Sequence, residues 1–111
     1  MICFNKMWKN IQTSKKCKRN IKELNYADIS LNDYIIIDVR SKREFKEVHL
    51  NGAINIPLLE VKRNIEKYIQ NKERRILVCC EYGIRSKQAA EILENLGYTQ
   101  VYNLKGGLEN I

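Results

Sequence analysis

The sequence contains no apolar run near the roughly 20 residues that a membrane-spanning helix needs, so it predicts no such helix. Its basic N-terminus lacks an uninterrupted apolar core and a small-residue cleavage site, and we therefore expect no secretory signal. It also lacks an internal repeat and a low-complexity linker. The 111 residues suit one domain with a modest core, and the expected location is the cytoplasm.

The residues that usually bind metals are few and poorly spaced. There is one histidine, and the four cysteines do not form two CxxC pairs: Cys3, Cys17, Cys79 and Cys80. We therefore expect no metal site and no cofactor. Because no export signal accompanies the four cysteines, we expect free thiols in a reducing compartment. A disulfide between the adjacent Cys79 and Cys80 would close a strained ring, and we do not expect one. Whether Cys17 serves as a resolving thiol for Cys80 stays open.

The net charge of +7 is unevenly distributed along the chain. Seven of the 20 basic residues and none of the 13 acidic residues lie in residues 1–22, so the remainder is neutral. Apolar residues scattered among these positive charges predict a helical arm over residues 1–19. A basic arm can bind nucleic acid or an anionic membrane. A solvated end of the chain is the more common case, so we expect no nucleic-acid partner.

Residues 20–111 alternate between strand and helix patterns. Strands are predicted at residues 21–24, 34–39, 53–56, 76–80 and 100–103. Helical segments are predicted at residues 25–29, from Ser41, at 58–71 and from about Ser86 to Gly97. Such alternation is typical of an α/β domain with a mainly parallel sheet.

The most informative stretch is residues 75–86, where a continuous apolar run ends in Cys80 and a tight turn through Gly83 leads into a helix. The positive end of that helix faces the sulfur, and such a position lowers the pKa of a thiol. Cys80 is therefore the candidate nucleophile. The alternative is a buried core cysteine, which we expect for Cys79, between the sheet and the helix.

The motif Cys80-x-x-Gly83-x-Arg85-Ser86 resembles the active-site loop of rhodanese-domain sulfurtransferases. Two further blocks match the same family in the same order, at residues 37–57 and 97–107, so the resemblance covers roughly residues 20–111. It implies a three-layer domain with helices on both faces of a mainly parallel sheet. It also implies transfer of a sulfane sulfur from thiosulfate or a persulfide to a thiol or cyanide, through a persulfide on Cys80.

Each residue of the loop has an expected role in such a reaction. The backbone N–H groups of the loop are expected to cradle a negatively charged sulfur: Glu81, Tyr82, Gly83, Ile84, Arg85 and Ser86. Glu81 and Tyr82 line the mouth, and Glu81 disfavours a doubly negative donor. Ser86 either donates its hydroxyl or caps the helix, and we favour the cap. Arg85 either holds an anionic donor or braces the loop by pairing with a carboxylate such as Glu44.

Four residues outside the loop are expected to support it. Asp38, Arg40 and Glu44 predict a structural group of ion pairs at the edge where ligands of open α/β sheets bind. His49 predicts a hydrogen-bonded loop anchor rather than a general base. Val48 stands where the family typically has a glycine, which affects the local turn. The pair Gly106–Gly107 is expected to pack closely against the active loop.

Two other classes of function share parts of this pattern. Phosphatases and arsenate reductases with a cysteine nucleophile separate it from their arginine by five residues, whereas four lie between Cys80 and Arg85. A non-enzymatic persulfide relay, or a binding or redox-sensing module, would keep the loop without turnover. The expected partners are a sulfur donor and a thiol acceptor, small or protein-borne. We expect a monomer or weak dimer.

Overall fold

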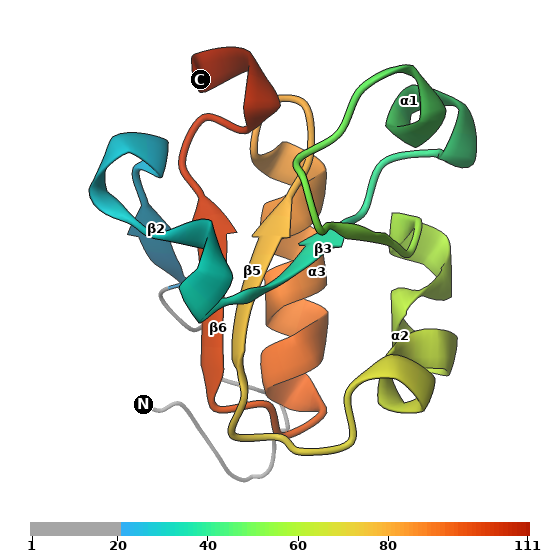
Figure 1. Cartoon of the computed structure of the whole chain (residues 1–111). Coiled ribbons are helices and arrows are strands. Elements are labelled where there is room, and N and C mark those ends of the chain that lie inside the picture. Colours follow the sequence, from blue (N-terminus) through green and yellow to red (C-terminus); the bar gives the residue numbers. More distant parts are fainter. Residues whose placement is uncertain (1–20) are drawn as a thin grey trace, which may run out of the picture.

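A computed structural model describes residues 21–111, and its centre is a five-stranded parallel sheet (Figure 1). The spatial order is β2-β6-β5-β3-β4. The bounds are β2 Lys22–Leu24, β3 Ile35–Asp38, β4 Ile54–Asn55, β5 Arg75–Cys79 and β6 Gln100–Leu104. The expected α/β class is confirmed. The arm expected at residues 1–19 lies outside the described residues.

One face of the sheet is covered by α2 (Leu58–Tyr68) and α3 (Ile84–Asn95), which contact each other, and α3 packs on β5 and β6. Alternate strand residues point to this face because side chains of a strand alternate between its two sides. The resulting core joins residues of the central strands to those of both helices: Ile37, Ile76, Val78, Cys80, Val101, Val61, Ile65, Ala89, Ala90 and Leu93. Within residues 21–111, no helix is long and apolar enough to cross a membrane.

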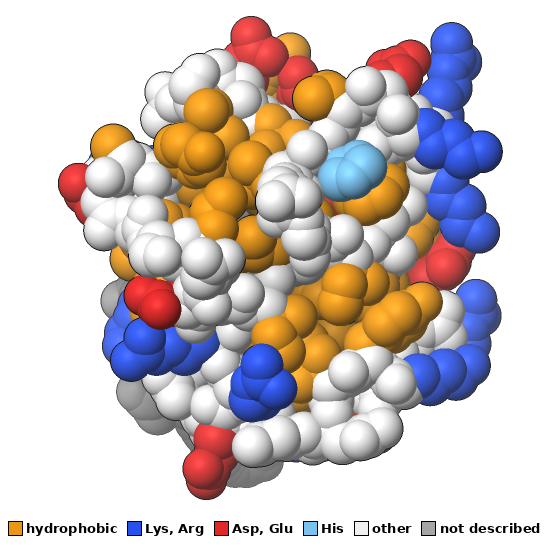
Figure 2. Space-filling view, in the orientation of Figure 1, with side chains coloured by type: hydrophobic (Ala, Val, Ile, Leu, Met, Phe, Trp, Pro, Cys, Tyr) orange, Lys and Arg blue, Asp and Glu red, His pale blue; other side chains and the backbone are white. Residues whose placement is uncertain are grey.

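The other face carries a thinner cover of short 3₁₀ helices and connecting segments. These helices are η1 (Tyr26–Asp28), η2 (Leu31–Asp33) and η3 (Leu108–Asn110). A second apolar cluster lies beneath them: Ile36, Leu77, Cys79 and Leu104, with Ile29, Leu31, Tyr34, Leu50, Tyr102 and Leu108 packed against it. Figure 2 shows this face, where apolar side chains remain visible at the surface.

Cys79 belongs to this second cluster, so the expectation that it packs between the sheet and the long helix is wrong. It is fully buried as expected, but the strand alternation turns it away from α3. Its neighbour Cys80 points to the α3 side instead.

Two helix boundaries differ from the sequence expectations. Helix α2 ends at Tyr68 rather than at residue 71, because Ile69 adopts an extended backbone and is buried at 3 % exposure. Helix α3 begins at Ile84 rather than near Ser86. Gly83 is its N-cap with φ of +90°, a backbone conformation that glycine adopts without steric cost, so the turn after β5 is completed early.

The parallel register brings the carboxyl ends of three strands to one edge of the sheet. Asp38 at the end of β3 lies beside Cys79 at the end of β5, and Val78 lies beside Asn103 of β6. The loops that follow these strands carry Arg40, Cys80 and Gly106–Gly107. Ligands of open α/β sheets bind at this edge.

Candidate active site

Cys80 is the first residue after β5, and its sulfur lies inside the turn that leads into α3. The Sγ atom accepts hydrogen bonds from the backbone N–H groups of Gly83, at 3.1 Å, and Ser86, at 3.3 Å. The side chain is only 1 % exposed. The sulfur is thus buried, but it faces inward-pointing amides at a helix N-terminus, an arrangement that favours negative charge.

Ser86 lies beneath the loop rather than at the helix cap, because α3 begins two positions before it. Its Oγ atom is 3.3 Å from the Cys80 sulfur and donates to Oδ1 of Asn103 at 2.5 Å. The amide nitrogen of Asn103 donates to the carbonyl of Gly83 at 3.0 Å, and this contact fixes which way the amide points. The favoured cap role is therefore wrong, and the hydroxyl instead joins the sulfur to a buried amide of β6.

The segment after β6 holds the other side of the loop. The N–H of Leu108 donates to the carbonyl of Cys80 at 2.8 Å, and that of Glu109 donates to the carbonyl of Glu81 at 2.9 Å. Gly107, which precedes them, approaches so closely that a Cβ atom on it would lie 2.6 Å from the carbonyl oxygen of Cys80. The expected close packing of Gly106–Gly107 near the loop is confirmed.

Arg85 turns away from the sulfur and braces the loop against α1 (Lys42–Glu47). Its two terminal nitrogens donate to the two carboxylate oxygens of Glu44, at 2.9 and 3.0 Å. Of the two roles that the sequence allowed for Arg85, the structure therefore shows pairing with Glu44 and not a guanidinium that faces an anionic donor. The Arg85 guanidinium, with the N–H of Ser41, lowers the pKa of Glu44 to about 2. Glu44 also forms a capping box with Ser41, at the start of the helix expected there.

The brace predicts a pH-dependent contribution to stability. Because the pKa of Glu44 is lower in the folded state than its ordinary 4.5, the pair stabilises fully above pH 4.5 and loses its contribution as the pH falls towards 2. Glu44→Gln keeps a capping-box acceptor but removes the charge. It should cost about 1 kcal/mol of unfolding free energy at pH 7, since both side chains are about one-third exposed. Urea unfolding at pH 7 and pH 3 measures the difference.

The matched control for that measurement is Glu47→Gln. Glu47 contacts Arg43 at 3.9 Å on the exposed side of α1, so its removal should change stability by a few tenths of a kcal/mol. Equal losses for the two variants, or a Glu44→Gln loss that is as large at pH 3 as at pH 7, would contradict the brace.

Asp38 and Arg40 form a buried ion pair next to the loop. The carboxylate of Asp38 accepts from the backbone N–H of Arg40 at 3.0 Å and from its Nη2 at 2.8 Å. The same guanidinium donates to the carbonyl of Val48 at 2.6 Å, and its Nη1 is 3.6 Å from the carboxylate of Glu81. The expected pairing of Asp38 with Arg40 is present, whereas Glu44 pairs with Arg85 instead. Arg40 also links Asp38 to Glu81 at the mouth of the loop.

His49 lies on the exposed connection after α1. Its ring stacks on Phe45, with centroids 3.7 Å apart, and its Nδ1 is 2.7 Å from the Phe45 carbonyl. These contacts describe the loop anchor that we expected. Within residues 21–111, His49 makes no hydrogen bond or ion pair with the Cys80 loop.

The two adjacent cysteines have different environments. Burial, followed by the nearby Asp38, raises the pKa of the Cys79 thiol well above its usual range, so this residue stays protonated. The sulfur of Cys80 has two amide donors instead. Only Cys80 therefore has the surroundings of a nucleophile.

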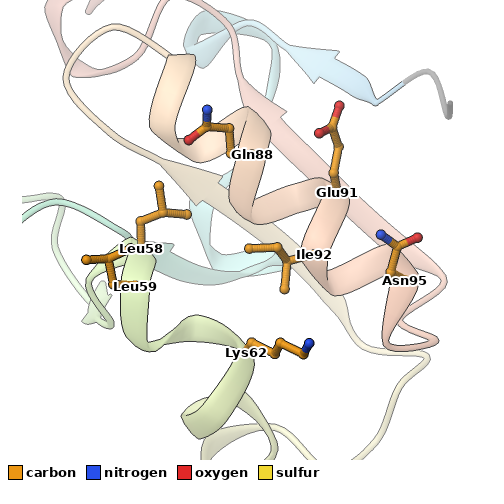
Figure 3. Close-up of a pocket in the computed structure, with 7 residues that line it drawn as sticks. All are labelled: Leu58, Leu59, Lys62, Gln88, Glu91, Ile92 and Asn95. Carbon is orange, nitrogen blue, oxygen red and sulfur yellow. The ribbon is translucent and has the colours of Figure 1, made fainter.

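A hollow of about 440 Å³ lies on another part of the surface, between α2 and α3 (Figure 3). Leu58 and Leu59 line one side of it, and Gln88, Ile92 and Asn95 line the other. It includes no residue of the Cys80 loop. Residues 21–111 also contain no group of three or more His, Cys, Asp or Glu side chains placed to hold a metal ion.

Sequence reasoning did not assign a role to Asn103 or Glu109. Asn103 could have been found, because it shares a buried strand face with Val101 and a polar residue there needs partners. Glu109 lies on an exposed 3₁₀ helix whose position against the loop depends on the path of the chain after Gly107. Nothing in the sequence alone indicates that path.

Comparison with known proteins agrees with this geometry. The Rhodanese-like domain family matches residues 13–111. Thiosulfate sulfurtransferase PspE of Escherichia coli K12 is 47% identical over 75 residues, which are 68% of this chain and 71% of that protein. Thiosulfate sulfurtransferase GlpE of Coxiella burnetii RSA 331 is 33% identical over 81 residues, 73% of this chain and 74% of that protein.

A solved structure described as rhodanese with anions from E. coli has a TM-score of 0.66 and 45% identity, and covers 70% of this chain and 91% of its own. These relatives agree with the enzyme class expected from the sequence, a rhodanese-type sulfurtransferase. The family match spans the sheet, the Cys80 loop and the glycine pair that holds it. The chain therefore belongs to the rhodanese-like domain family.

Proposed function

We propose that this protein moves a sulfane sulfur from a donor to a thiol or cyanide acceptor through a persulfide on Cys80. The observation that carries the proposal is the position of the Cys80 sulfur, which two backbone amides contact at the N-terminus of α3. Residues 20–111 form the catalytic domain in this proposal, and residues 1–19 are an appended arm. The reducing cytoplasm is the setting that keeps Cys80 available.

The reaction has two steps that balance without a cofactor. The Cys80 thiolate attacks the outer sulfur of thiosulfate, the S–S bond of the donor breaks, and sulfite leaves with the electron pair, which gives Cys80–S–S⁻. For a persulfide donor R–S–S⁻, the leaving group is R–S⁻. An acceptor thiolate or cyanide then attacks the terminal sulfur, and Cys80 leaves as the thiolate.

The loop suits the negative charge of both the Cys80 thiolate and the persulfide formed on it. Ile84, Arg85 and Ser86 occupy the first turn of α3, where backbone N–H groups lack partners within the helix. These amides and the helix dipole stabilise an anion placed above Cys80. Gly83 permits the turn that directs them, and the exposed Tyr82 lies at its rim.

Phosphatase or arsenate reductase chemistry is disfavoured because the guanidinium groups of Arg85 and Arg40 are already paired with carboxylates. In those reactions a guanidinium must hold the tetrahedral oxyanion. Here both terminal nitrogens of Arg85 are bound by Glu44, and the guanidinium of Arg40 is bound by Asp38. The ring between Cys80 and Arg85, one residue shorter, suits a single sulfur atom.

Intact-protein mass spectrometry tests the proposal. After incubation with thiosulfate or a thiol persulfide, the protein should gain one sulfur, about 32 Da, and should lose it on addition of cyanide with formation of one equivalent of thiocyanate. Hydrolysis of a phosphate ester without a sulfur adduct would favour the phosphatase. An adduct that no acceptor removes would favour a sensing or binding module.

A further inference from the structure

The hydroxyl of Ser86 is buried between two acceptors beneath the Cys80 loop. Its Oγ atom is 3.3 Å from the Cys80 sulfur and 2.5 Å from Oδ1 of Asn103. Ser86 is 0 % exposed and Asn103 is 1 % exposed, so solvent does not reach either side chain to replace a lost partner. A serine hydroxyl has one hydrogen atom, so it can donate to only one of the two acceptors at a time.

The orientation of the Asn103 amide decides which acceptor the structure pairs with this hydrogen atom. The Nδ2 atom of Asn103 donates to the carbonyl of Gly83 at 3.0 Å and to the carboxylate of Glu23 at 3.4 Å. The nitrogen end of the amide therefore faces two acceptors, and the oxygen end accepts from Ser86. A lone pair of Ser86 Oγ then faces the sulfur, which suits a Cys80 thiol that donates its own hydrogen.

The same arrangement does not suit a Cys80 thiolate. A thiolate has no hydrogen, so the lone pair of Ser86 Oγ faces a negatively charged sulfur. Rotation of the hydroxyl moves its hydrogen from Asn103 to the sulfur, and a hydrogen bond to a charged acceptor is about twice as strong as a neutral one. The rotation leaves the buried Oδ1 of Asn103 without this donor, which is unfavourable. The charge on the sulfur therefore decides between the two positions.

We propose that the Ser86 hydroxyl is a two-position donor that follows the charge on the Cys80 sulfur, and that Asn103 is the positioning residue that competes for its hydrogen. When Cys80 is a thiolate, the hydroxyl donates to the sulfur beside the amides of Gly83 and Ser86. When a persulfide forms, the charge moves to the outer sulfur, Sγ becomes neutral, and the hydroxyl returns to Asn103. Each turnover thus contains a hydroxyl exchange between Cys80 and Asn103.

The hydroxyl exchange assists unloading rather than loading, a consequence that rests on the proposed function. During unloading, cyanide forms a bond to the outer sulfur, the S–S bond breaks, and its electron pair returns to Sγ of Cys80. The Ser86 hydroxyl then donates to a sulfur on which charge is developing, while its hydrogen stays bonded to Oγ. During loading, the same contact already stabilises the reactant thiolate, so it does not accelerate the attack on the donor.

The first test measures the ionisation of Cys80 without any sulfur donor. The pH dependence of alkylation by iodoacetamide gives a midpoint for Cys80, with fragment ions in mass spectrometry to separate it from Cys79. Ser86→Ala should raise this midpoint by at least about half a pH unit, because the thiolate loses a donor. Asn103→Leu should lower it by a similar amount, because the hydroxyl loses the acceptor that competes with the sulfur.

The opposite signs separate the hydroxyl exchange from a merely structural role, because a loosened loop would move both midpoints in the same direction. Once Ser86→Ala is present, Asn103→Leu should have no further effect on the midpoint. Asn55→Leu is the matched control. The Asn55 amide donates to the carbonyls of Asp38 and Arg40 at the same edge of the sheet, and its loss should leave the midpoint unchanged.

Charged and titratable side chains surround Cys80 on each neighbouring element, and these variants change none of them. They are Cys79 of β5, Glu81 of the loop, Asp38 and Arg40 at the end of β3, Arg85 of α3, Glu109 of η3 and Glu23 of β2. Their effect on the midpoint therefore cancels between wild type and variant. Any effect that Asn103→Leu transmits through Glu23 or Gly83 would remain in the double variant, where it is measured separately.

The second test separates the two steps of sulfur transfer. Loading from thiosulfate is measured at a pH where Cys80 is fully ionised, and unloading by cyanide is measured as loss of the added sulfur. Ser86→Ala should slow unloading about fivefold and should not slow loading. Ser86→Thr keeps a hydroxyl at this position and should unload within about twofold of wild type.

Midpoints that move in the same direction in Ser86→Ala and Asn103→Leu, or an Asn103→Leu effect that persists without the Ser86 hydroxyl, would overturn the hydroxyl exchange and leave the proposed function intact. If Asn103→Leu does not fold, equal midpoints in Ser86→Ala and Ser86→Thr would overturn it instead. If the midpoints shift as expected but no donor loads Cys80 in wild type, the hydroxyl exchange stands and the proposed function fails.

Discussion

Cys80→Ser is expected to abolish sulfur transfer, with a loss of roughly 10³-fold or more in kcat/KM. The serine hydroxyl can still accept from the amides of Gly83 and Ser86, so the loop keeps its hydrogen bonds and the fold is retained. An alcohol at this position does not ionise near neutral pH, however, and cannot form a persulfide. Thiocyanate formation from thiosulfate and cyanide, and loading from persulfides, measure the loss.

The matched variant is Cys79→Ala at the neighbouring position. Its thiol is fully buried on the opposite face of the sheet and stays protonated, so its removal should leave kcat/KM within about twofold. The small cavity should cost about 1 kcal/mol of stability. Comparable activity in Cys80→Ser and wild type would show that Cys80 is not the nucleophile.

Gly107→Ala is expected to produce the largest loss of stability among the glycine variants. The backbone of Gly107 has φ of +69° and ψ of −166°, a region that is essentially restricted to glycine. A Cβ atom would also meet the carbonyls of Cys80 and Glu81, which are backbone groups and cannot rotate away. We expect a loss of about 3 kcal/mol or more and a large fall in activity, because the loop must shift.

Gly52→Ala separates the two causes of that loss. Gly52 also has a positive φ, of +85°, but a Cβ atom there would have no heavy atom within 4 Å. It should cost about 1 kcal/mol and leave sulfur transfer unchanged. Thermal unfolding and the transfer assay, run on both variants, make the comparison. If Gly107→Ala were no worse than Gly52→Ala in either assay, the close support of the loop would be disproved.

The sheet and the position of Cys80 could be predicted because they depend on local patterns. The apolar run before Cys80 and the spacing of Gly83 and Arg85 specify a buried strand, a turn and a helix. The capping box at Ser41 similarly specifies the start of α1. Each of these signals lies within a few residues of the element that it predicts.

Features that depend on the three-dimensional path could not be predicted in the same way. From the sequence, Arg85 could bind either an anionic donor or a carboxylate such as Glu44. It pairs with Glu44 because α1 and α3 lie close enough in space for the two side chains to meet. Ser86 is not the helix cap that we expected, because α3 begins at Ile84. The Ser86 hydroxyl instead contacts the Cys80 sulfur and Asn103. Alternation showed that Cys79 and Cys80 face opposite sides, but not which side α3 covers.

The central claim is that the backbone amides around Cys80 Sγ also bind the outer sulfur of a persulfide formed on Cys80. A crystal structure of the protein loaded with a donor tests it most directly. The account predicts one added sulfur atom bonded to Sγ of Cys80 and within hydrogen-bond distance of N–H groups in the first turn of α3. A sulfur added to another cysteine, or one on Cys80 that no loop amide contacts, would contradict it.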